Sequence, residues 1–154
     1  MSKIRTRYFG DLDCPDDARL HFTEGLPGFE TERWFVLLEQ PQTKPLVFLQ
    51  SLSDPQLCFI SLPVQLVDPD FDLSMSADDR EALGLGTGRQ PRIGEEVLCL
   101  ALVTLSETHP PTGNLLAPVV IHLKTREALQ AIQTGSSYSH RQPITPSSLE
   151  PVCS

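Results

Sequence analysis

The sequence has little basic charge, no paired cysteine motif and no long apolar run. Its 154 residues include 12 lysines and arginines against 20 acidic residues, so the formal net charge is −8. An acidic surface repels phosphate backbones, and we therefore expect no direct nucleic-acid binding. The longest near-apolar stretch, residues 97–105, is about half the length that a membrane-spanning helix needs. Because residues 1–10 also lack the apolar segment of a signal peptide, the sequence predicts a cytoplasmic protein without a membrane partner.

The four cysteines form no metal-binding motif. None of them, Cys14, Cys58, Cys99 or Cys153, belongs to a CxxC pair, and their spacings match no zinc template. Cys58 and Cys99 lie in apolar segments, which predicts that both are buried, since free cysteine behaves as a small hydrophobic residue. Together with His122 they could still meet in space as a metal site or a thiol nucleophile with its base. A small metal- or thiol-dependent enzyme is therefore an alternative, although no catalytic motif or cofactor site is present and we expect a protein that is not an enzyme.

Fourteen prolines favour short strands joined by rigid loops over a helical bundle. Runs of alternating or continuous apolar residues predict strands, three of which, from residue 33 to residue 62, indicate an antiparallel meander. Pro118 lies inside one predicted strand and suggests a sheet edge or a bulge there. The predicted strands cover residues 3–9, 19–22, 33–39, 45–51, 57–62, 71–75, 95–105 and 114–124.

One short helix is predicted after Ser76. Ser76 is a favourable N-cap, Asp79 stands three residues later, and Gly84 ends the pattern. Asp78, Asp79 and Glu81 place negative charge in the first turns, where the helix dipole favours it. This acidic run is consistent with two interpretations. It is either the solvated start of a helix or an electrostatic surface that binds a basic partner.

Three further segments carry weaker patterns. Residues 125–134 have helical propensity around Ala128 but are equally consistent with a strand by length. Residues 84–94 are rich in glycine and predict a flexible connection. Residues 142–154 are rich in proline and serine, which predicts a disordered or loosely attached tail.

Five segments, taken in order, resemble the flagellar assembly factor FliW family. They are the opening strand at residues 4–10, the glycine-proline loop at residues 22–30, the segment at residues 48–55, the stretch at residues 112–126 and the closing residues 138–141. The order and the separations also agree, and the likeness spans residues 3–143.

The resemblance implies a mainly β fold, a small antiparallel β-barrel-like domain with one short helix over residues 1–143, followed by a tail at residues 144–154. It also implies that residues 125–134 are a strand. Members of this family bind flagellin before export and bind CsrA, an RNA-binding translational repressor, so that flagellin supply is coupled to its translation. A plain structural or oligomerising module is a further alternative, and the oligomeric state is left open.

The candidate partner-binding residues come from two sources. The acidic helix start is the candidate surface for CsrA. The family-like segments add turn residues and the residues that follow them, although glycines and prolines in these segments can equally be turn formers. The full set is Asp54, Pro55, Asp78, Asp79, Glu81, Asn114, Leu115, Leu116 and Pro118.

Overall fold

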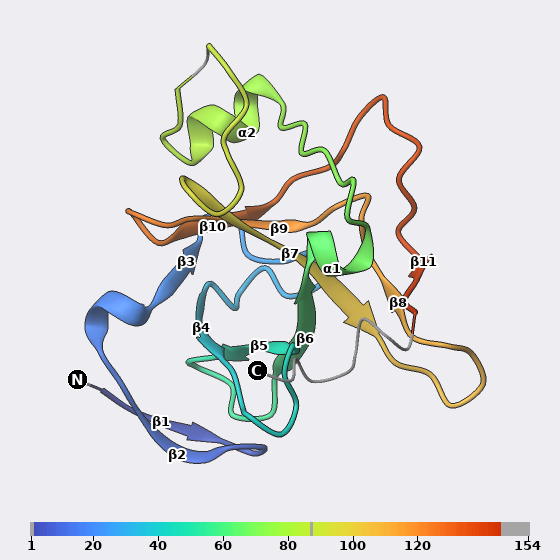
Figure 1. Ribbon diagram of the computed structural model, residues 1–154. Helices are drawn as coiled ribbons and strands as arrows, with labels where there is room; N and C mark the ends of the chain where they lie inside the picture. Colours follow the sequence, from blue (N-terminus) through green and yellow to red (C-terminus); the bar gives the residue numbers. More distant parts are fainter. Residues whose placement is uncertain (1, 87, 146–154) are drawn as a thin grey trace.

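The computed structural model describes residues 2–86 and 88–145, which are mainly β-structure (Figure 1). Within this part of the chain seven strands close into a barrel in the order β7-β6-β5-β4-β3-β10-β9, and β9 pairs back onto β7. The predicted meander is confirmed by the antiparallel pairing of β4, β5 and β6. The barrel strands are β3 (Leu20–Phe22), β4 (Trp34–Leu38), β5 (Val47–Ser51), β6 (Cys58–Pro63), β7 (Val97–Thr104), β9 (Val119–His122) and β10 (Glu127–Gln130).

The predicted antiparallel barrel-like fold is confirmed, with one exception among the barrel pairings: β3 and β10 pair in parallel. This short ladder is reinforced by side chains. His21 Nδ1 lies 3.0 Å from Glu127 Oε2, and Arg126 Nη2 donates to the Ala18 carbonyl at 3.1 Å. The strand at β10 also confirms the strand reading of residues 125–134, because pairing on both sides overrides the helical propensity of Ala128.

Strand β7 separates two hydrophobic clusters by the alternation of its side chains. Leu98 and Leu100 face the barrel interior, whereas Cys99 and Ala101 face an outer cluster. The outer cluster is covered by two short helices, α1 (Val64–Val67) and α2 (Ala77–Ala82), and by the segment between them. The predicted helix is confirmed as α2, while the one-turn helix α1 was not expected. No helix in the described part of the chain is long and apolar enough to cross a membrane.

The strand predicted at residues 71–75 does not form, although the alternation of buried and exposed side chains on which it was based is present. Phe71, Leu73 and Met75 are buried and the residues between them are exposed. No ladder forms, because side chains take up the backbone N–H groups instead. Ser74 N–H donates to Gln133 Oε1 at 2.7 Å, and Met75 N–H donates to Gln90 Oε1 at 2.8 Å. Alternating apolar residues indicate which side chains of an extended segment are buried, but they do not indicate whether a neighbouring strand pairs with its backbone.

The first predicted strand forms a hairpin apart from the barrel. β1 (Ser2–Thr6) pairs with β2 (Gly10–Cys14), which was not expected, and Figure 1 shows this hairpin on the opposite side of the molecule from α2. Lys3 lies opposite Asp13 and Arg5 lies opposite Asp11, so these two basic residues of β1 face acidic residues of β2. Tyr8 lies beyond the strand and is 59% exposed.

The first residues of the predicted tail belong to the fold. β11 (Gln142–Pro143) pairs with β8 (Thr112–Gly113), and Ile144 is buried with its N–H donating to the Pro111 carbonyl at 3.0 Å. Gln142, Pro143 and Ile144 are therefore part of the fold, which corrects the expectation of a loose tail for these residues. The rest of the predicted tail, residues 146–154, lies outside the described residues.

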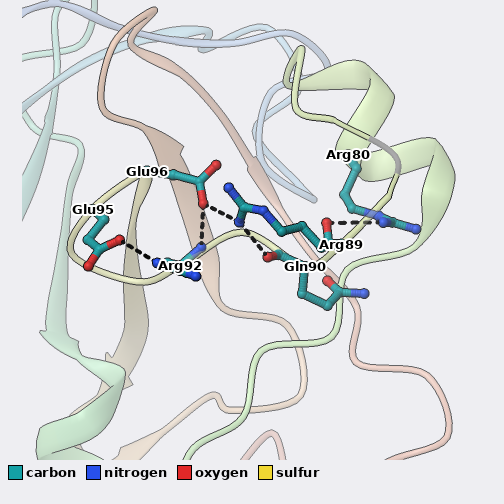
Figure 2. A network of polar contacts seen from close by, with 6 residues as sticks. All are labelled: Arg80, Arg89, Gln90, Arg92, Glu95 and Glu96. Carbon is teal, nitrogen blue, oxygen red and sulfur yellow. Dashed lines mark hydrogen bonds and ion pairs between the residues drawn. The ribbon is translucent and has the colours of Figure 1, made fainter.

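The connection from α2 to β7 is held by a polar network (Figure 2). Arg89 Nη1 donates to Glu96 Oε1 at 2.6 Å, and Glu96 Oε1 also accepts from the Arg92 N–H at 3.1 Å. Arg80 on α2 donates to the Arg89 carbonyl at 3.2 Å. Although the glycines predicted a flexible connection, these contacts tie its second half to both flanking elements.

Candidate functional site

An acidic groove of about 740 Å³ opens where α2, the 23–30 loop and the turn after Asn114 meet. Four carboxylates line it, and no lysine, arginine or histidine among the described residues does so. The apolar part of its lining includes Leu129 and Ile132, and the Ile132 side chain is 59% exposed. The four acidic residues are Glu24, Glu30, Asp78 and Asp79.

The 23–30 loop is anchored to the end of the barrel by its apolar residues. Leu26 is 2% exposed and belongs to the interior cluster, so it anchors the loop. Phe29 is 40% exposed but its ring packs edge-on against Phe59 at a centroid distance of 5.3 Å. Gly25 has a φ of +70°, and a Cβ there would lie 2.6 Å from the Cα of Glu30. The loop therefore needs glycine at position 25 both for its φ and for the close approach of the backbone.

Helix α2 presents only part of its acidic run to the groove. Ser76 caps the helix by accepting the Asp79 N–H at 3.1 Å, as predicted. Asp78 and Asp79 line the groove, whereas Glu81 does not. Arg80 donates to the Arg89 carbonyl at 3.2 Å (Figure 2). Arg80 itself is not among the residues that line the groove.

The groove carboxylates differ in their electrostatic surroundings. Burial raises the pKa of Asp79, the Ser76 hydroxyl lowers it, and the neighbouring charges of Asp78 and Glu24 raise it further. The pKa of Glu30 is lowered because its carboxylate accepts the Gly28 N–H at 3.1 Å. Carboxylates close together without a cation destabilise one another, so a cationic group of a partner would be favoured here.

The turn that begins at Asn114 contributes two residues to the groove, Asn114 and Ala117. Asn114 Oδ1 accepts the Ala117 N–H at 2.9 Å, so this side chain forms the turn as well as lining the groove. Leu115 is fully buried in the outer cluster and Pro118 is buried just before β9. These two side chains present no surface to a partner. Leu116 is half-buried and does not line the groove.

Asp54 and Pro55 lie elsewhere, in the turn between β5 and β6. The Pro55 carbonyl accepts the Arg7 N–H at 2.9 Å, so this turn adjoins the β1–β2 hairpin. Asp54 Oδ1 accepts the Gln56 N–H at 3.0 Å, and buried Gln50 donates to the Asp54 carbonyl at 3.3 Å. Both residues act as turn formers in this position, and the structure does not bring them together with the acidic helix.

The residues of the alternative catalytic site are not assembled. Cys99 is 1% exposed within the outer cluster, and Cys58 is half-buried on β6. His122 Nδ1 accepts the Lys124 N–H at 3.1 Å and so is used in the turn after β9. Among residues 2–86 and 88–145 no three His, Cys, Asp or Glu side chains gather as metal ligands. The enzyme alternative therefore gains no support from the geometry.

The burial of Cys58 and Cys99 leads to a testable prediction about how fast their thiols react. Burial raises the pKa of Cys99 from 9.0 to about 12 and the pKa of Cys58 from 9.0 to about 11. Because only the thiolate reacts, the reactive fraction of Cys99 near pH 8 falls about a thousandfold and that of Cys58 about a hundredfold. We expect slow alkylation of both in the folded protein, measured by iodoacetamide labelling and peptide mapping. The same protein in denaturant is the control, and labelling of Cys99 at equal rates in both states would contradict the prediction.

Two groove residues, Glu24 and Glu30, were not among the sequence candidates. They lie in the glycine-proline loop at residues 22–30, which the sequence indicated only as a turn and as a family-like segment. The available signal was that both ends of this loop carry an acid. What the sequence did not show is that the loop folds next to α2, more than forty residues away.

Comparison with known proteins gives one consistent family. The FliW protein family model matches residues 3–144. Flagellar assembly factor FliW of Heliobacterium modesticaldum is 33% identical over 147 residues, which are 95% of this chain and 92% of that protein. The protein of the same name from Pseudothermotoga lettingae is 39% identical over 137 residues, covering 84% and 80%. A crystal structure of the flagellar assembly factor FliW superposes with a TM-score of 0.82 at 28% identity, covering 94% of this chain and 98% of that one.

Proposed function

The chain belongs to the FliW family, and we propose from this premise that it is a flagellar assembly factor that binds flagellin and antagonises CsrA. In this role it would act in the cytoplasm as a binding protein without turnover. The observation that carries the proposal is the acidic groove, a concave surface that four carboxylates line and that no lysine, arginine or histidine of the described residues lines.

The chemistry of the groove suits a protein partner with basic residues. An RNA-binding repressor needs lysine or arginine side chains to neutralise phosphates, and such side chains are attracted to clustered carboxylates. Exposed Ile132 adds apolar area beside Asp78 and Asp79. Apolar contact surrounded by complementary charge is typical of protein–protein interfaces.

Isothermal titration calorimetry against flagellin and, separately, against CsrA tests this function. We expect a complex with each partner, and a competition titration then shows whether flagellin displaces CsrA. Binding to flagellin alone would leave an export chaperone without the regulatory role. If neither protein binds and light scattering shows self-association, the oligomerising-module alternative replaces the proposal.

A further inference from the structure

A second depression, the histidine cleft, adjoins the acidic groove. It has a volume of about 790 Å³ and lies where β7 ends and β8 and β11 pair. Phe59, Val103 and Pro110 form its apolar part, and Arg141 lies on it beside two histidines, His109 and His140. No aspartate or glutamate in the described part of the chain lines it.

The two depressions share part of their lining. Leu102 and Asn114 line both of them, and the Asn114 N–H donates to the Leu102 carbonyl at 2.9 Å. Leu102 lies in the last part of β7 and is half-buried, with its side chain packed against the interior cluster. The acidic groove and the histidine cleft therefore adjoin at Leu102 and Asn114, and together they are called the trough.

The trough has opposite charge at its two ends. Glu24, Asp78 and Asp79 stand at the α2 end, and Arg141 with the two histidines stands at the other. Between the two ends lie Leu102 and Asn114, and Leu102 gives this middle part its apolar surface. A partner segment that is basic throughout would meet Arg141, whereas an acidic segment or a nucleic acid would meet the four carboxylates.

We propose that the trough binds a single partner segment of dipolar charge, with basic residues at the α2 end, apolar residues over Leu102 and acidic residues at Arg141. This inference deepens the proposed function, because it rests on the trough being the partner surface and specifies the chemistry of the segment that fills it. Opposite charges at the two ends also fix the direction in which that segment lies.

Synthetic peptides test the dipolar occupant without using flagellin or CsrA. Three peptides share an apolar centre and differ in their ends, which are lysine and glutamate, lysine at both ends, or glutamate at both ends. We expect the lysine–glutamate peptide to bind at least about fivefold more tightly than either uniform peptide in fluorescence anisotropy at low salt, a difference that salt reduces. Equal affinity of the dipolar and the all-lysine peptides would overturn the proposal.

Protein variants then locate the two ends of the bound peptide. The double variant Asp78→Asn with Asp79→Asn should weaken the dipolar peptide about fivefold and leave the all-glutamate peptide no weaker. Arg141→Gln should weaken the dipolar peptide by a similar factor and leave the all-lysine peptide no weaker. Arg5→Gln, on the distant β1–β2 hairpin, is the control for a change of charge alone.

The outcomes separate this inference from the proposed function. Loss of dipolar peptide binding in only one of the two end variants would mean that the depressions act separately, which overturns the single trough. Flagellin or CsrA binding that neither end variant affects would also overturn it, while leaving the proposed function in place. Conversely, the expected peptide result without binding of flagellin or CsrA would uphold the dipolar trough and reject those two partners.

Discussion

Replacing Gly25 with alanine is expected to lower the free energy of unfolding by about 2–4 kcal/mol and to abolish partner binding. The φ of +70° is unfavourable for a side chain, and the new Cβ would lie 2.6 Å from the Glu30 Cα. Glu30 must then move, and with it the wall of the acidic groove and the Leu26 anchor. Urea denaturation measures the loss of stability, and titration with flagellin or CsrA measures the loss of binding.

Gly28→Ala is the matched control for this prediction. Gly28 lies in the same loop with a φ of +85°, but a Cβ added at that position would have no other atom within 4 Å. The Gly28→Ala variant should therefore lose only the free energy that comes from the unfavourable φ, about 1 kcal/mol of the free energy of unfolding, and should keep measurable partner binding. Equal losses for the two variants would show that the close approach to Glu30 has no separate effect.

Reversing one charge in the groove is expected to weaken binding of a basic partner far more than reversing one outside it. Asp78→Lys and Glu81→Lys change the net charge equally, and both residues are exposed on α2. Only Asp78 lines the groove. We expect about tenfold weaker binding for Asp78→Lys at low salt, because it places a cation among Glu24, Asp79 and the incoming basic side chain.

Surface plasmon resonance at two salt concentrations measures this effect. Most of the change should appear in the association rate and should shrink at high salt, as expected for steering by exposed charge. Glu81→Lys reports the contribution of overall charge, and circular dichroism checks that both variants keep α2. If both variants weaken binding to the same degree, the overall charge of −8 and not the groove attracts the partner.

Much of the fold could be predicted from local patterns. Alternation and apolar runs located six of the seven barrel strands, all except β10, and Ser76 with Asp79 located α2. Capping and side-chain period are properties of a few neighbouring residues, so local patterns suffice for them. The same local reasoning failed at residues 71–75, where the buried alternation is right but Gln133 and Gln90 replace a partner strand. It also missed β2, whose sequence, Gly-Asp-Leu-Asp-Cys, carries little apolar signal.

The candidate site was predictable only in part. Asp78, Asp79 and Asn114 meet in the acidic groove, whereas Asp54 and Pro55 form a separate turn. Leu115 and Pro118 were chosen for a family-like segment, yet the fold buries both. A single sequence does not distinguish a residue that shapes a turn from one that faces a partner, since glycine, proline and asparagine serve both purposes.

The sequence by itself determined the class of the molecule: its net charge of −8, its short strands, its capped helix and its lack of a metal-binding motif. Each of these depends on composition or on residues within one turn or strand. Only the tertiary structure decided which acids act together, because Glu24 and Asp78 approach through the closing of the barrel and the packing of α2 on its outer face. The energy of a charge–charge interaction depends on the distance between the charges in space and not on their separation in the sequence, so the acidic groove is a property of the fold.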